Sequence, residues 1–360
     1  MTTRLPRQHL PRPYALLATG LLVAPGAQAI DATREDVSGF IGRMSTEHGF
    51  DAAALAAVLT DAQSNPDILS RISKPAEKTL TWQEYRARFI TERRISRGVA
   101  VANAQAAALD RAATAGVPAN YLLAITGVET FYGEVTGKFR VVDALATLGF
   151  DYPPRSPFFR GQLEEYLLMT REESLDPLVP LGSYAGAMGI PQFMPGSFRA
   201  YAVDGDGDGK RDLWNDWSDV FASVANYLLK NGWKPGEPVM APADASAANL
   251  EGLPADKLTP SETVGSLRAR GVRFQTTLPD DAPAVLVPLV VDSGIEYRVG
   301  FQNYYAITRY NRSELYASAV NDLAESIAAV HRAPPPPFSS GPAADAPAPP
   351  STEPTPGSPQ

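Results

Sequence analysis

The stretch Gly116-Val-Pro-Ala-Asn-Tyr-Leu-Leu-Ala-Ile-Thr-Gly-Val-Glu-Thr-Phe-Tyr-Gly-Glu134 predicts an apolar helix that carries one carboxylate, Glu129, near its end. Pro118 can begin this helix, because the first helical position needs no amide proton. Apolar residues recur at helical spacing, and glycines bracket the expected end. These residues are Leu122, Ile125, Val128, Gly127 and Gly133.

The position of Glu129 suggests acid chemistry. Poor hydration and the negative end of the helix dipole both disfavour the ionised form of a carboxyl group. A carboxyl that stays protonated near neutral pH can act as a general acid, so Glu129 is the candidate catalytic residue. The alternative interpretation is a solvated residue at a frayed helix end, since acidic residues are common at such places.

The amino terminus has the pattern of a secretory signal peptide over residues 1–29. Arginines precede an apolar run from Tyr14 to Val23, and small residues follow up to Ala29, after which we expect cleavage. The run is too short for a permanent bilayer anchor. The absence of cysteine excludes disulfides, thiolate metal sites and a lipid-modified amino-terminal cysteine. The sequence therefore predicts an exported, periplasmic protein without a stable membrane anchor.

Composition limits the possible classes of function. The chain has 360 residues, of which 44% are hydrophobic, which is enough for two or three packed domains. Without residues 1–29, 29 basic residues face 40 acidic ones, a formal charge of about −11. Nucleic-acid binding is not expected at this balance. Residues 333–360 are rich in proline and alanine and cannot form a core, so we expect a disordered tail.

Helical patterns dominate the first third of the chain, and residues 30–115 are expected to form a helical domain. Asp51 is placed to cap one helix there, and Thr81 and Glu84 fit a capping box for another. A second capping box, Thr259 to Glu262, predicts a short helix through Leu267. The other helices are expected at about 160–172, 217–232 and 313–330.

A small β region is expected within an α/β segment, residues 236–300. Residues 284–291 are rich in valine and leucine and predict a strand, interrupted by Pro288. A turn at 292–294 leads to a second strand, in which Tyr297, Val299 and Phe301 alternate.

The segment Gly182–Ser197 is a loop by composition. Four glycines allow close backbone approach, and two prolines stiffen it. Tyr184, Gln192 and Phe193 offer stacking and hydrogen bonding. The segment fits the wall of a groove for a polar polymer, and it equally fits an ordinary surface loop.

The sequence Asp204-Gly-Asp-Gly-Asp-Gly-Lys-Arg-Asp212 is the sharpest local motif. Oxygen ligands at alternate positions, with glycine at the sixth, match the start of an EF-hand calcium loop. The candidate ligands are Asp204, Asp206, Asp208, Lys210 through its carbonyl, and Asp212. The twelfth position is Asn215 and not glutamate, so Asp216 or Asp219 would have to complete the coordination. A structural Ca²⁺ is the prediction, and an acidic turn without metal is the alternative.

Several of these blocks together resemble the lytic murein transglycosylase B family. The matching blocks are Gly127–Gly133, Gly182–Pro195, the aspartate loop before Leu213-Trp214, Ser223–Tyr227 and Ile307–Asn311, in order within residues 36–330. The resemblance implies a mainly α (α+β) fold with a lysozyme-like catalytic core, an added helical domain and an EF-hand-like calcium site. The core would be residues 116–235 and 301–332, with the calcium loop at 204–219.

The resemblance also implies roles for individual residues. Glu129 becomes the sole catalytic acid and base, with Ser183 and Asn311 beside it, and Asp219 becomes the residue that completes the calcium site. The glycan groove would be lined by Tyr184, Gln192, Phe193, Tyr227, Tyr310 and Tyr316. The absence of cysteine suggests a soluble relative of lipoprotein members.

The implied reaction uses one carboxylate where most glycosidases use two. Glu129 would protonate the bond between N-acetylmuramic acid (MurNAc) and N-acetylglucosamine (GlcNAc), and would then deprotonate the muramoyl 6-hydroxyl, which closes a 1,6-anhydro ring. A second carboxylate such as Glu134, Asp143 or Asp151 could instead position water, which would make the protein an inverting muramidase. A non-catalytic murein-binding scaffold is the third hypothesis. The expected partner is peptidoglycan, bound by a monomer that could also meet other cell-wall proteins.

Overall fold

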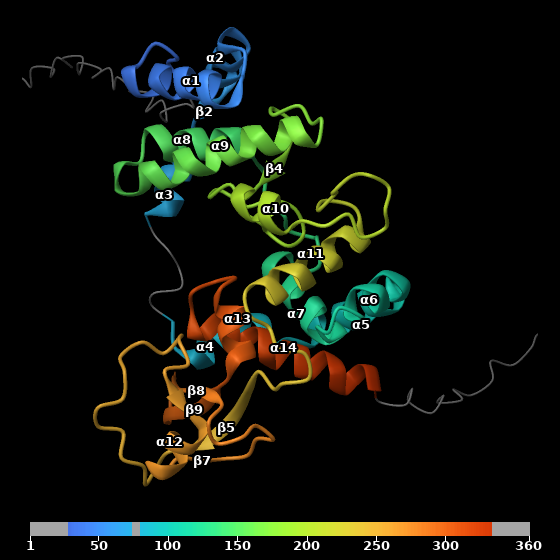
Figure 1. The fold of residues 1–360 in the computed structure, drawn as a ribbon, viewed down its shortest axis with the longest axis vertical. Helices are drawn as coiled ribbons and strands as arrows, with labels where there is room; N and C mark the ends of the chain where they lie inside the picture. Colours follow the sequence, from blue (N-terminus) through green and yellow to red (C-terminus); the bar gives the residue numbers. More distant parts are fainter. Residues whose placement is uncertain (1–27, 74–79, 333–360) are drawn as a thin grey trace, which may run out of the picture.

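The structure, a computed structural model, describes residues 28–73 and 80–332. Figure 1 shows an elongated arrangement with helices at one end, a second helical group in the middle and an antiparallel sheet at the other end. The helices are α1 (Glu35–His48), α2 (Ala52–Asp61), α3 (Pro66–Ile72), α4 (Trp82–Phe89), α5 (Glu92–Ala104), α6 (Ala106–Ala113), α7 (Ala119–Thr130), α8 (Val141–Phe150), the 3-10 helix η2 (Pro153–Arg155), α9 (Ser156–Glu172), α10 (Pro195–Tyr201), α11 (Trp217–Lys230), α12 (Val264–Ala269), α13 (Gln302–Thr308) and α14 (Glu314–Arg332). The strands are β1 (Gln28–Ala29), β2 (Gln63–Ser64), β3 (Phe139–Arg140), β4 (Leu181–Gly182), β5 (Met240–Asp244), β6 (Glu262–Thr263), β7 (Arg273–Phe274), β8 (Pro283–Val291) and β9 (Gly294–Gly300).

Helices from the predicted amino-terminal domain divide between two groups. At the end opposite the sheet, α3 and α9 pack against α8, and α1 packs against α2. Helices α4, α5 and α6 instead join the middle group, where α14 contacts α4 and α5, and α11 contacts α6. Packing therefore crosses residue 115, and the domain division remains a prediction. Both expected caps here are confirmed: Asp51 accepts the Ala54 amide, and Thr81 and Glu84 form the capping box.

Helix α7 carries Glu129 and packs against α5, α6, α11 and α14. It is buried on nearly every side, and Glu129 is half-buried in the last turn. Pro118 precedes the helix as its cap and does not occupy the first helical position. After Thr130 the backbone turns through the left-handed conformation at Phe131 and Tyr132, with φ of 53° and 60°.

The end of α7 at Thr130 lies between Gly127 and Gly133, as predicted, and Gly127 lies inside the helix, where it makes room for an aromatic ring. A Cβ at Gly127 would lie 2.7 Å from Cζ of Tyr132, which is 2% exposed. The left-handed turn thus folds the ring of Tyr132 back onto the helix. Close packing at this point orders the residues that directly follow Glu129.

The sheet is antiparallel, in the order β6-β8-β9-β5-β7, and exceeds the predicted hairpin. β8 runs unbroken through Pro288, which pairs with Tyr297, so the expected interruption is wrong. β6 pairs with β8 only at residues 283–284, which leaves Pro288 at an edge where no amide proton is needed. The expected second strand is confirmed as β9.

The capping box predicted at residues 259–262 is also wrong. Helix α12 begins after Thr263, whose side chain accepts the Ser266 amide, and Glu262 belongs to β6. The sequence around Thr263 offers a second box one helical turn later, and sheet pairing selects it. The helices expected at 160–172, 217–232 and 313–330 are confirmed as α9, α11 and α14, whereas α8, α10 and α13 were not predicted. Because α10 begins at Pro195, residues 195–197 of the predicted loop Gly182–Ser197 are helical.

Two predictions lie largely or wholly outside the described residues: the signal peptide and the disordered tail at 333–360. Of the signal segment only Gln28 and Ala29 are described, and they pair with Ser64 and Gln63. Within residues 28–73 and 80–332, no helix combines the length and apolar character needed to cross a bilayer.

Candidate active site

Glu129 is held by a tyrosine from the far end of the chain. The hydroxyl of Tyr316 donates a hydrogen bond of 2.6 Å to Oε1 of Glu129. Tyr316 lies in the first turns of α14, which packs along α7, and its side chain is 2% exposed. Burial, and next the nearby charge of Glu129, raise the pKa of Tyr316 well above its usual value. The phenol therefore remains a proton donor and fixes the orientation of the carboxyl group.

Further predicted groove residues form a continuous aromatic cluster beside Tyr316. Tyr310 stacks on Tyr316 at 6.4 Å between ring centroids and lies 4.6 Å from Tyr227. Phe193 lies 5.8 Å from Tyr310 and 5.6 Å from Tyr227. The cluster joins three chain segments that are distant in sequence, and it brings together four of the residues named by the resemblance.

The tyrosine hydroxyls of this cluster are bonded to the backbone. Tyr310 donates to the carbonyl of Pro191 at 2.7 Å, and Tyr227 donates to that of Arg309 at 2.5 Å. Burial raises the pKa of Tyr227 to about 12. Tyr310 thus ties the Gly182–Ser197 loop to the segment that carries Asn311, and Tyr227 ties α11 to the same segment. Phe193 is 2% exposed and serves as a packing residue of this aromatic cluster.

The glycine-rich loop, Gly182–Ser197, is ordered by hydrogen bonds within it and by one to Thr136. Gln192 adopts a φ of 52°, and its side-chain amide donates to Thr136 and Gly189 carbonyls at 3.0 and 2.9 Å. The hydroxyl of Ser183 accepts the amides of Ala185 and Ala187. Ser183 and Tyr184 thus lie in the predicted loop, and the contacts that hold Ser183 are within the loop.

Asn311 and Tyr184 are placed at the borders of this region. Asn311 directly follows Tyr310 in the connection to α14 and is half-buried. Tyr184 is half-buried and packs against the main core. The roles of both as groove residues remain predictions.

Thr130 is a residue of this site that the sequence analysis did not single out. Its hydroxyl donates to the carbonyl of Ile190 at 2.8 Å and accepts the amide of Gly133 at 2.9 Å. Thr130 is 1% exposed and directly follows Glu129. It joins the end of α7 to the glycine-rich loop. A threonine beside a candidate acid is visible in sequence, but its partner 60 residues away is not.

The aspartate loop brings three carboxylates together beside the start of α11. Oxygens of Asp204, Asp206 and Asp219 lie within 4.8 Å of one another. Asp219 is 2% exposed, and its two oxygens accept the amides of Gly205 and Asp212 at 2.7 and 2.6 Å. Burial raises the pKa of Asp219, whereas backbone amides, first that of Gly209, lower the pKa of Asp204.

The remaining predicted ligands occupy different roles in the loop. Asp208 accepts the Lys210 amide, and Asp212 accepts those of Trp214 and Asn215, so both shape turns. Asp216 caps α11 through the amides of Ser218 and Asp219. Of the two candidates for the residue that completes the site, Asp219 therefore faces the loop. An all-oxygen set around a buried carboxylate fits Ca²⁺.

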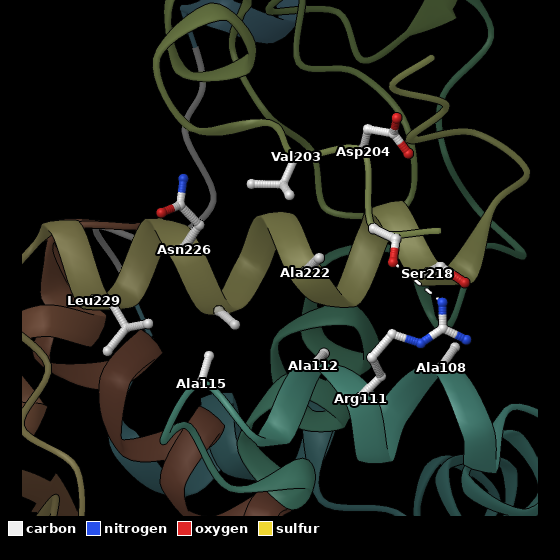
Figure 2. Close-up of a pocket in the computed structure, with 12 residues that line it drawn as sticks. Ala108, Arg111, Ala112, Ala115, Val203, Asp204, Ser218, Ala222, Asn226 and Leu229 are labelled. Carbon is white, nitrogen blue, oxygen red and sulfur yellow. Dashed lines mark hydrogen bonds between the residues drawn. The ribbon is translucent and has the colours of Figure 1, made fainter. Parts of the chain in front are cut away.

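The aspartate loop and the Glu129 site are connected by hydrogen bonds that meet at Ile190. Leu213, next to Asp212, accepts the amide of Ile190 at 2.8 Å. Ile190 in turn accepts the hydroxyl of Thr130. The aspartate loop also contacts α6, where Arg111 donates to the carbonyl of Gly205 at 3.2 Å. A cavity of about 310 Å³ lies beside this bond, between α6 and α11 (Figure 2). Small side chains from both helices line this cavity, which is separate from Glu129.

Comparison with known proteins identifies the family of this chain. The family model "Transglycosylase SLT domain" matches residues 32–325. The membrane-bound lytic murein transglycosylase B of Escherichia coli (strain K12) is 41% identical over 307 residues, which is 82% of this chain and 84% of that protein. The chain therefore belongs to the lytic murein transglycosylase B family, as the sequence motifs predict.

Solved structures agree in fold. The soluble lytic transglycosylase SltB1 of Pseudomonas aeruginosa is 49% identical, with a TM-score of 0.77 over 82% of this chain and 99% of that one. The E. coli lytic transglycosylase Slt35 in complex with calcium is 39% identical, with a TM-score of 0.76 over 85% and 96% of the two chains. The predicted mainly α, lysozyme-like fold is confirmed.

Proposed function

We propose that this chain is a lytic transglycosylase that cleaves the MurNAc-β-1,4-GlcNAc bond of peptidoglycan without water and leaves 1,6-anhydroMurNAc ends. The observation that carries the proposal is a single carboxyl group, Glu129, oriented by the buried hydroxyl of Tyr316 beside the aromatic cluster. Family membership supports the same reaction class.

Glu129 acts twice on the substrate. As the acid it protonates the glycosidic oxygen, while the N-acetyl group of the substrate meets the positive charge at the anomeric carbon. As the base it then removes the proton from the muramoyl 6-hydroxyl, which attacks the anomeric carbon. The Tyr316 hydrogen bond keeps one oxygen in place through both steps, and Thr130 holds the end of the helix.

The positions of the other acidic residues support the transglycosylase over the inverting hydrolase. Asp143 pairs with Arg140, Asp151 pairs with Arg34, and Glu134 pairs with both Arg93 and Arg97. An inverting enzyme needs a carboxylate that activates water opposite the bond. Each of the three candidates named from the sequence is instead held in an ion pair.

Mass spectrometry of fragments released from purified sacculi tests this proposal. We expect products lighter by one water than muramidase products, with no reducing muramic ends. Reducing ends would support the hydrolase, and absence of any release with retained murein binding would support the non-catalytic scaffold.

We further propose that Asp204, Asp206 and Asp219 hold a structural Ca²⁺, with Asp208, Lys210 and Asp212 shaping the loop or adding oxygens. When bound, the cation would neutralise carboxylates that otherwise repel one another. Its expected effect is on stability, because the loop reaches the Glu129 site indirectly, through the hydrogen bonds of Ile190 with Leu213 and Thr130. Calorimetry with calcium and with chelator tests this, and an unchanged unfolding temperature would remove the metal site.

The amino-terminal pattern supports export to the periplasm, with cleavage after Ala29 and no lipid anchor. Amino-terminal sequencing of the mature protein from cell fractions would test the cleavage point and the compartment. An intact amino terminus in the cytoplasmic fraction would contradict the proposal.

A further inference from the structure

Three arginines surround the residues that follow Glu129. Arg93, Arg94 and Arg97 lie in the first turns of α5, which packs against α7. The guanidinium carbons of Arg93 and Arg94 lie 4.8 and 5.0 Å from the ring centroid of Phe131, two residues after Glu129. Arg93 and Arg97 both form ion pairs with Glu134, at 3.3 and 3.1 Å.

This arginine cluster borders the same backbone segment as the predicted groove. Residues 131–136 follow α7 directly, and the carbonyl of Thr136 accepts the side chain of Gln192. The opposite part of the segment, at Phe131 and Glu134, contacts the arginines. A ligand that extends along this short segment from Glu129 therefore meets positive charge.

The charge of the cluster is not explained by stability. The guanidinium groups of Arg93 and Arg97 share one carboxylate, that of Glu134, although the chain has 40 acidic and 32 basic residues. Cations in the first turn of a helix oppose the helix dipole. The side chain of Arg93 is 79% exposed, and exposed ion pairs contribute little to folding.

Burial leaves the charge of Arg94 poorly solvated. Desolvation, opposed in part by Tyr132 and reinforced by Arg93, lowers the pKa of Arg94. The Nε atom of Arg94 is buried without a hydrogen-bond partner among the described residues. An unneutralised cation in this position favours an anionic neighbour.

We propose that the arginine cluster binds the carboxylates of the peptide stems of murein, so that stem-bearing strands are preferred over bare glycan. This inference rests on the proposed function and adds a determinant of substrate preference to it. A guanidinium fork matches a carboxylate through two parallel hydrogen bonds. Arg93 and Arg97 are the exposed members that a peptide can reach, and Glu134 is the internal carboxylate that it would displace or share.

The double variant Arg93→Gln/Arg97→Gln tests the proposal with two substrates: glycan strands with their stem peptides and the same strands after amidase removal of the stems. We expect KM for stem-bearing strands to rise about three- to tenfold, with kcat nearly unchanged, because charged hydrogen bonds are lost on binding. KM for stripped strands should not change. The matched control is Arg268→Gln, an exposed arginine paired with Asp280 in the sheet region.

A second variant, expected to lower KM where the first raises it, distinguishes the proposal from a simple folding defect. Glu134→Gln removes the internal competitor and should lower KM for stem-bearing strands only, while unfolding temperatures report on the fold of each variant. Equal losses on both substrates, or no change on either, would overturn the proposal. Failure of the proposed function is a separate result, since the wild type would then release no anhydro products from either substrate.

Discussion

A carboxylate stands at the end of α7 and another at the start of α11, and their surroundings suit them to different tasks. Glu129 lies in the last turn of α7, where a neutral phenol from α14 is its partner. Asp219 lies in the first turn of α11, where two backbone amides and two further aspartates surround it. The first arrangement holds a single group that can gain and lose a proton. The second concentrates negative charge and fits a cation.

Because of this difference, we expect the loss of Glu129 to change activity and the loss of Asp219 to change stability. Removal of Glu129 should abolish activity and spare the fold. Removal of Asp219 should weaken the fold first.

The largest effect is expected for Glu129→Gln. The amide keeps the size of the side chain but cannot transfer a proton, so murein clearing should fall by about a thousandfold or more. The assay is release of anhydro fragments from sacculi, with the unfolding temperature as control. Activity close to that of the wild type would remove Glu129 as the acid.

Tyr316→Phe should lower kcat by about ten- to a hundredfold, because a hydrogen bond to a charged group is lost while the ring still fills its site. Steady-state kinetics on soluble glycan strands measures this change. The unfolding temperature should move little. A rise in KM at constant kcat would instead assign Tyr316 to substrate binding.

Asp219→Asn should lower the free energy of unfolding by about 2 kcal/mol, since its oxygens bind two amides and, as proposed, a cation. Calorimetry should also show that calcium no longer raises the unfolding temperature of this variant. The control is Asp216→Ser, which retains a helix cap outside the three-carboxylate group. An unchanged response to calcium in Asp219→Asn would place the metal elsewhere.

The smallest effect is expected for Thr130→Val, which removes the hydroxyl that joins α7 to Ile190 but keeps the shape of the side chain. We expect a loss of about 1 kcal/mol in stability and a severalfold loss in kcat. Thr130→Ser should restore kcat, because the hydroxyl is present again. If both variants lose the same activity, packing and not the hydrogen bond positions Glu129.

The motifs of the candidate sites can be recognised in the sequence, because each lies within a short stretch of the chain. Glycine and aspartate alternate over a few residues in the calcium-type loop, and an apolar helix ending in Glu129 has helical periodicity. Helix starts can also be predicted where the capping side chain and the amide that it binds are close in sequence, as at Asp51 and Thr81. Capping at Thr263 was misplaced because pairing of β6 with β8, a tertiary event, selects between two adjacent boxes.

The predominance of helices follows from spacing along the chain, and the motifs that resemble the family, with Glu129 among them, are each contained in a short stretch of sequence. The orientation of Glu129 does not follow from such a stretch, since its partner Tyr316 is 187 residues away. Nor does the choice of Asp219 over Asp216, which depends on the side of α11 that meets the loop. Contacts of this kind form only when distant segments pack together, because one-dimensional periodicity describes which face of an element is apolar but not which element will cover it.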